Sequence, residues 1–155
     1  AKDNNGNTAL KLAAALGRSD ALKFLIEKGS KLDEANKEGW TPVMSATAKN
    51  HVDCMKTLLD KGAEPDMKTK DGVTALYIAA SNGSTGALEI LLQKTLKIDE
   101  PTANGSTPLM AAAEGNHVDC MRALLEKKGS NVDEVDDDGW TALMQAAEKN
   151  HVECM

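Results

Sequence analysis

The chain has 155 residues, which is room for one domain or for one continuous stack of repeats. Aromatic residues make up only 3% of the chain, so the core must use small and medium aliphatic side chains, which favours close-packed helices over a β-sandwich. The net charge of −6 provides no basic surface for nucleic acid or for an anionic membrane, and neither is an expected partner.

The sequence also predicts a compartment. No apolar run approaches the ~20 residues of a membrane span, and the first residues lack the charged and apolar regions of a secretory signal. The cysteines Cys54, Cys120 and Cys154 are odd in number and fall within predicted helices, so no disulfide scaffold is expected. We therefore expect a cytoplasmic chain in a reducing environment, without membrane insertion.

A repeat of about 33 residues organises the chain. Threonine followed by Ala or Pro recurs at Thr8, Thr41, Thr74, Thr107 and Thr141, and Asn-His-Val-Asp-Cys-Met at 50–55 returns at 116–121 and, with Glu for Asp, at 150–155. One helix pair per repeat cannot bury its apolar face alone, so the repeats must stack on their neighbours. The predicted domain spans residues 1–155, with units at about 3–35, 36–68, 69–101 and 102–135 and a partial unit at 136–155.

Each unit is predicted to begin with a hairpin-like tip and a first helix. In the second unit the tip ends at Glu38-Gly39, because glycine after a polar residue favours a tight turn. Thr41-Pro42 then starts a helix, since the hydroxyl can cap a free N–H group and proline loses nothing at the first helical position. This helix is expected to run to Lys49.

A second helix is predicted to follow a short break. Asn50-His51 interrupts the first helix, because asparagine tolerates a left-handed turn. The second helix runs from Val52 to about Lys61, with an apolar stripe at Val52, Met55, Leu58 and Leu59, and ends before Gly62. In the third unit Thr95 replaces the terminal glycine and Gly86 lies inside the helix, so this unit is expected to be the least stable.

The units resemble a known family. Residues 107–119, Thr-Pro-Leu-Met-Ala-Ala-Ala-Glu-Gly-Asn-His-Val-Asp, followed by Leu124-Leu125-Glu126 and Gly129, closely resemble the ankyrin repeat family, and similar stretches cover nearly the whole chain. The resemblance implies an all-α ankyrin-repeat solenoid of stacked helix-turn-helix units with hairpin-like tips. The family's usual histidine after the Thr-Pro-Leu motif is replaced by Lys11, Met44, Tyr77, Met110 and Met144, so helix packing must compensate for its hydrogen bonds.

The resemblance also implies where partners bind. Ankyrin stacks bind along the concave face of tips and first helices, at positions that vary between units. In the first and second units these positions are Asn4, Asn5, Asn7, Lys37, Glu38, Trp40, Ala48 and Lys49. In the third and fourth units they are Lys70, Asp71, Val73, Ser81, Asn82, Ala103, Asn104, Ser106, Glu114 and Gly115. In the fifth unit they are Asp137, Asp138, Trp140, Glu148 and Lys149. Each tryptophan follows a tip glycine, where it can contact a partner or lie across neighbouring tips.

Charge divides the chain into two halves. Residues 1–77 hold 12 basic and 11 acidic side chains, a net charge of +1, whereas residues 78–155 hold 6 and 13, a net charge of −7. A protein or peptide partner with a basic stretch would therefore be steered to the C-terminal half.

No catalytic, metal or cofactor site is predicted. The His-x-x-Cys pairs, such as His51 and Cys54, offer two ligands per unit, and zinc needs four, while stacked helices stand ~8–10 Å apart. The acidic stretch 133–138 lacks an EF-hand's twelfth carboxylate, because that position is Gln145, and only weak cation attraction is left. No G-x-S-x-G motif, phosphate-binding glycine loop or Ser/His/Asp arrangement occurs.

The predicted function is therefore a non-catalytic protein-protein interaction module. Two alternatives stay open, namely a regulatory or targeting region of a larger enzyme or channel, and a structural spacer. The stack has no polar terminal caps and reaches only four residues into the second helix of its last unit, so we expect a slice of a longer array or a larger protein. The isolated slice is expected to be monomeric.

Overall fold

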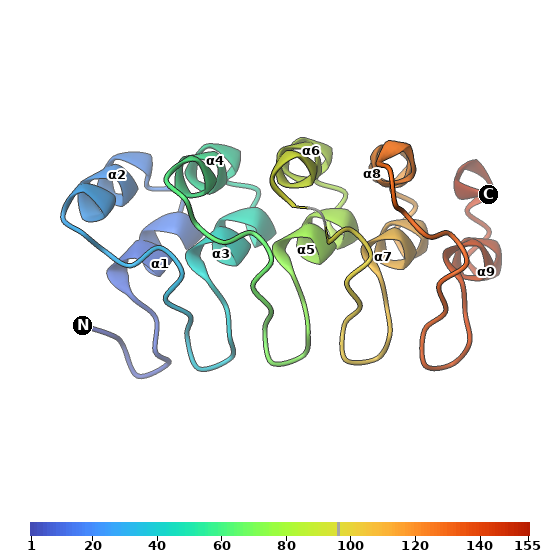
Figure 1. The fold of residues 1–155 in the computed structure, drawn as a ribbon, viewed down its shortest axis with the longest axis horizontal. Helices are drawn as coiled ribbons and strands as arrows, with labels where there is room; N and C mark the ends of the chain where they lie inside the picture. The colour runs from blue at the N-terminus through green and yellow to red at the C-terminus, as the bar shows by residue number, and fades with distance from the viewer. Residues whose placement is uncertain (96) are drawn as a thin grey trace.

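The computed structural model describes residues 1–95 and 97–155, and helices form two layers there (Figure 1). The first-helix layer consists of α1 (Ala9–Ala15), α3 (Pro42–Ala48), α5 (Ala75–Ser81), α7 (Pro108–Glu114) and α9 (Ala142–Glu148). The second-helix layer consists of α2 (Ser19–Glu27), α4 (Val52–Asp60), α6 (Thr85–Lys94), α8 (Val118–Glu126) and the short 3-10 helix η1 (Val152–Cys154). The predicted all-α solenoid of helix pairs is confirmed.

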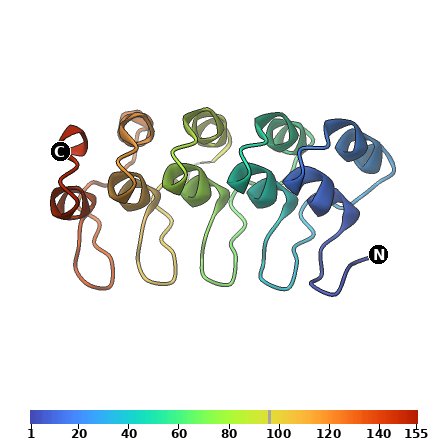
Figure 2. The same cartoon turned by 180° about the vertical axis from the view of Figure 1, so that it is seen from behind.

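Hairpins connect each second helix to the next first helix and project from one side of the stack (Figure 2). Consecutive first helices pack against each other along the whole stack, and each also packs against the second helix of its own unit. Within the described ranges, no helix has the length and apolarity needed to cross a membrane.

The threonines start the first helices as predicted. Thr41 Oγ1 accepts a hydrogen bond from the Met44 N–H at 3.3 Å, and the threonines of the other four units do the same for the residue three positions on. Pro42 occupies the first turn of α3. The helix ends at Ala48, one residue before the predicted end, because the chain turns there into the left-handed conformation of Asn50, with φ of 56°.

Small side chains bring the first helices together. Five alanines at the same position of the repeat, Ala13, Ala46, Ala79, Ala112 and Ala146, are all buried. A methyl side chain allows neighbouring helices to approach closely, and alanine also has the highest intrinsic preference for the helix. Alanines therefore line the contact between neighbouring units, as the low aromatic content of the sequence suggests.

The second helices bury the predicted stripe against the first helices. In α4, Met55 and Leu58 are fully buried and Leu59 is nearly so, whereas Val52 is half-buried. Burying a leucine side chain contributes about 1.5–3 kcal/mol relative to leaving it exposed. The helix ends at Asp60, and Gly62 follows with φ of 95°, a conformation that glycine adopts without strain.

The second helix of the third unit is followed by Thr95 and not by a glycine. Thr95 is buried, and its hydroxyl donates to the Asp66 carboxylate of the preceding unit while accepting a hydrogen bond from the Lys97 N–H at 2.9 Å. This threonine therefore links two units at the point where the first, second and fourth units use a left-handed glycine. Gly86 lies in α6 with open space where a β-carbon would be.

In the second and fourth units, a buried methionine occupies the position of the family's usual histidine. Met44 and Met110 are 1% exposed, and the Met110 sulfur accepts a hydrogen bond from the Thr107 N–H at 3.4 Å. At the same position, the Tyr77 hydroxyl lies 3.4 Å from Ser106 Oγ of the next hairpin. The expectation that packing compensates is met at Met44 and Met110 but not in the last unit, where Met144 is exposed, and Tyr77 adds a polar contact between units.

Candidate functional site

The tip face is the surface formed by the hairpins at 36–40, 69–73, 102–106 and 136–140 together with the exposed side of the first helices. Its hairpins are closed by the side chain at their first position. Asn36 Oδ1 accepts hydrogen bonds from the N–H groups of Glu38 at 3.0 Å and Trp40 at 2.9 Å. Asp136 Oδ1 does the same for Asp138 at 3.1 Å and Trp140 at 2.8 Å. This closure holds the residue after the tip glycine in a fixed place.

Neighbouring hairpins are also joined to one another. The N–H of Lys70 donates to the carbonyl of Glu38 at 3.1 Å, and the N–H of Asp137 donates to the carbonyl of Asn104 at 3.1 Å. Gly39 lies at φ of 86°, and a β-carbon there would stand 2.8 Å from Thr69 Cα. Glycine is therefore required at this tip both by its backbone conformation and by the close approach of the next hairpin. The tip face is a continuous, hydrogen-bonded platform.

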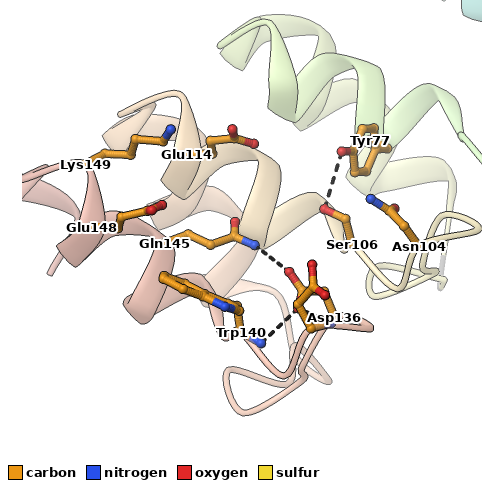
Figure 3. A pocket seen from close by; sticks show the side chains of 10 residues that line it. Tyr77, Asn104, Ser106, Glu114, Asp136, Trp140, Gln145, Glu148 and Lys149 are labelled. Atoms are coloured by element: carbon orange, nitrogen blue, oxygen red, sulfur yellow. Dashed lines mark hydrogen bonds between the residues drawn. The ribbon is translucent and has the colours of Figure 1, made fainter.

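An open hollow of about 400 Å³ lies on this platform among the last three units (Figure 3). We call it the C-terminal hollow, and its lining residues are Tyr77, Asn104, Ser106, Glu114, Asp136, Asp138, Trp140, Gln145, Glu148 and Lys149. A second hollow of about 350 Å³ adjoins it through Tyr77 and Asn104, and its other lining residues are Asp71, Val73, Thr102 and Ala103. Together they extend from the third unit to the fifth.

Two hydrogen bonds order one wall of the C-terminal hollow. Asp136 accepts from the Trp140 N–H through Oδ1 and from Gln145 Nε2 through Oδ2, the latter at 3.0 Å (Figure 3). These contacts tie the last hairpin to α9. Gln145 Oε1 is buried and has no hydrogen-bond partner among the described residues.

The hollow is strongly acidic. Glu114, Asp136, Asp138 and Glu148 bring four negative charges and Lys149 one positive charge, which leaves a net charge of −3. Among residues 1–95 and 97–155, the carboxylates of Glu114, Asp138 and Glu148 form no ion pair or hydrogen bond. These three charges remain available to a ligand.

The structure brings some of the predicted contact residues together and leaves others apart. Those that line the two hollows are Asp71, Val73, Ala103, Asn104, Ser106, Glu114, Asp138, Trp140, Glu148 and Lys149. Exposed positions outside these hollows are held by Lys37, Glu38, Lys49, Lys70 and Asp137. Trp40 packs against the hydrophobic core, whereas Trp140 lines the C-terminal hollow.

Three residues that line the C-terminal hollow are not among the contacts that the sequence predicts. The sequence identifies Tyr77 only as a replacement for the usual histidine, and Gln145 only as a missing calcium ligand. Asp136 occupies the hairpin-closing position, which recurs as Asn36 in the second unit and is readable from the repeat period. The reach of Gln145 back to Asp136 depends on side-chain geometry, which the repeat pattern does not specify.

The histidines and cysteines serve packing and contacts between units. His117 Nε2 lies 3.1 Å from the Ser81 carbonyl, and His151 Nδ1 lies 3.0 Å from the Ala113 carbonyl. Cys120 is a buried free thiol with its sulfur 3.5 Å from Thr85 Oγ1, and burial raises the pKa of this thiol. Within the described part of the chain, no three His, Cys, Asp or Glu side chains are placed to hold a metal ion.

Comparison with known proteins agrees with this architecture. A family model for ankyrin repeats, covering three copies of the repeat, matches residues 1–69, 30–102, 61–135 and 95–155. A comparison with curated proteins finds no match. The family matches overlap and together span every helix pair and hairpin described above. The chain belongs to the ankyrin repeat family.

Proposed function

We propose that this chain is a non-catalytic module that binds a segment of a partner protein along the tip face. Ankyrin repeats are generally protein-protein interaction modules, and the matched repeats run from residue 1 to residue 155. In this proposal the units at 3–35, 36–68, 69–101, 102–135 and 136–155 act as one continuous, monomeric domain. The free thiols support a reducing compartment for it.

One observation carries the proposal: the hairpin framework of the tip face is the same from unit to unit, whereas the exposed side chains on it differ between units. The second and fifth units close their hairpins with the same pair of hydrogen bonds, from Asn36 and from Asp136. At matched positions on this common frame, Lys37 is replaced by Asp137. A frame that repeats while its exposed residues vary is what a modular binding surface requires.

The charge of the tip face supports a partner segment with a basic stretch. The C-terminal hollow has a net charge of −3, and residues 78–155 together carry a net charge of −7. Complementary charge speeds the encounter and fixes the orientation of a bound segment. The basic residues Lys37, Lys49 and Lys70 occupy the other end of the same face, so the segment should run with its basic end toward the fifth unit.

A selection of peptides of random sequence tests this function. Peptides selected from a random display library against the chain are measured for affinity against Trp140→Ala and against Glu89→Gln, an exposed residue of the second-helix layer. We expect enrichment of basic peptides that bind Trp140→Ala at least about tenfold more weakly, because tryptophan anchors often cost 2 kcal/mol or more when truncated. Glu89→Gln should leave the affinity unchanged.

The proposal is contradicted if the selected peptides bind Trp140→Ala as tightly as the original chain, or if Glu89→Gln weakens them equally. Circular dichroism of each variant shows whether the helices are retained, so that loss of the fold is separated from loss of the surface.

A further inference from the structure

Two units carry tryptophan at the same tip position but in different surroundings. Their residue numbers differ by 100, and matched positions exchange Ser45 for Gln145 and Ala48 for Glu148. Ser45 is buried and donates its hydroxyl to the Thr41 carbonyl at 2.9 Å, whereas Gln145 reaches Asp136 in the hairpin. The frame is shared, and both units carry a carboxylate just before the tip glycine, Glu38 and Asp138. Of the two, the fifth unit alone adds carboxylates at the matched positions 136 and 148.

The carboxylates of the C-terminal hollow favour a positively charged ligand, and their arrangement favours an organic cation over a metal ion. Glu148 comes from α9 and Glu114 from α7 (Figure 3), and Asp138 comes from the last hairpin, so the negative charges approach the hollow from three elements. No three such groups in the described ranges are close enough together for one metal ion. A cation with several separated hydrogen-bond donors fits this spread arrangement better than a point charge.

Trp140 provides the second feature of the hollow. Its backbone is held by the 2.8 Å hydrogen bond to Asp136, and its side chain lines the hollow while half-buried. An indole attracts cations, and a planar guanidinium can also stack on it. Tyr77, held 3.4 Å from Ser106 Oγ, lines the hollow from the third unit.

We propose that the C-terminal hollow is a seat for an arginine side chain of the bound segment. The guanidinium lies against the Trp140 indole and donates hydrogen bonds to Asp138 and Glu148. An open hollow of about 400 Å³ leaves room for a side chain and for the backbone that carries it. This inference rests on the proposed function, because it names the residue type that the tip face would recognise.

The test uses short peptides as probes. The chain is titrated with acetyl-Gly-Arg-Gly-amide and with its lysine and citrulline analogues, and the indole N–H signals of Trp40 and Trp140 are followed by NMR. We expect the arginine peptide to shift the Trp140 signal in a saturable, salt-sensitive way and to leave Trp40 unmoved. Citrulline keeps the shape but lacks the charge, and should shift neither. Lysine should bind about tenfold more weakly, because it lacks the planar fork.

A matched pair of double variants separates the hollow from the overall charge. Asp138→Asn with Glu148→Gln removes two charges from the hollow, and Glu89→Gln with Glu126→Gln removes two from the second-helix layer. We expect the first pair to weaken arginine binding about tenfold and the second to leave it unchanged. Equal effects of the two pairs of substitutions would overturn the proposed arginine site. In the peptide titration, equal responses to arginine and citrulline, equal affinity for arginine and lysine, or equal shifts of the Trp40 and Trp140 signals would overturn it as well.

The outcome is distinct from that of the peptide selection. If the tripeptide fails to bind while selected peptides still depend on Trp140, the arginine seat is wrong and binding on the tip face stands. If selected peptides ignore Trp140, the proposed function is wrong, whatever the tripeptide does.

Discussion

Glycine has opposite roles at two places in this stack. Gly39 lies at φ of 86°, and its missing side chain admits the next hairpin, since a β-carbon would stand 2.8 Å from Thr69 Cα. Gly86 lies inside α6, has no such backbone conformation, and faces open space. The first glycine is needed by the structure, whereas the second adds flexibility to the unfolded chain and little to the folded one.

Replacing these two glycines by alanine should therefore change stability in opposite directions. Gly86→Ala should raise the free energy of unfolding by about 0.5–1 kcal/mol, because alanine favours the helix and meets no neighbour. Gly39→Ala should lower it by more than about 1 kcal/mol, because it adds both strain and a clash. Urea unfolding followed by circular dichroism measures both changes. A destabilised Gly86→Ala variant would contradict this account of α6.

At the scale of the elements, the repeat pattern predicts the helices well and the surface less completely. The threonines that start the first helices, and the left-handed conformations of Asn50 and Gly62, can be predicted from local chemistry. The helices of the second unit end about one residue before the predicted positions. The second-helix stripe follows from spacing alone. These features depend on residues near one another in the chain, which is why the sequence suffices to predict them.

Features that join distant residues are not predictable in the same way. The hydrogen bond from the Asp137 N–H to the Asn104 carbonyl joins residues that are 33 positions apart in the chain, and it uses backbone groups that carry no sequence signal. The contact of Gln145 with Asp136 depends on how far α9 stands from its hairpin. The different placement of Trp40 and Trp140 likewise arises from their neighbours, since both residues follow the same tip glycine.

The hairpin-closing position offers a prediction at this scale. Asn36 makes the same two backbone contacts in the second unit as Asp136 makes in the fifth. Asp136→Asn should therefore keep the hairpin closed and change stability by less than about 0.5 kcal/mol. Asp136→Ala should cost about 1–2 kcal/mol, because it removes the acceptor from two N–H groups and from Gln145.

Thermal and urea unfolding of the two Asp136 variants provide the comparison. If Asp136→Ala is as stable as Asp136→Asn, closure by the side chain contributes nothing to the hairpin. In that case the backbone hydrogen bond from the Asp136 N–H to the Trp140 carbonyl, 3.0 Å long, would hold the hairpin alone.

At the scale of the whole molecule, the second-helix layer and the tip face have different roles, the first in packing and the second in the proposed binding. The second-helix layer carries the apolar stripe and links between units such as the ion pair of Lys94 with Asp60 at 3.1 Å. The tip face carries the hollows and the unpaired carboxylates. Its charge is mixed in the second and third units, where Lys37 and Lys70 adjoin Glu38 and Asp71, and acidic at the fifth unit. Binding should therefore leave the second-helix layer unaffected.

The most direct test of this account is an NMR titration of the whole chain with a basic peptide selected against it. The account predicts that backbone signals shift in the hairpins at 102–106 and 136–140 and in α7 and α9, with small changes elsewhere. Larger shifts in α2, α4, α6 and α8 than on the tip face would contradict it, because the binding surface would then lie on the opposite layer.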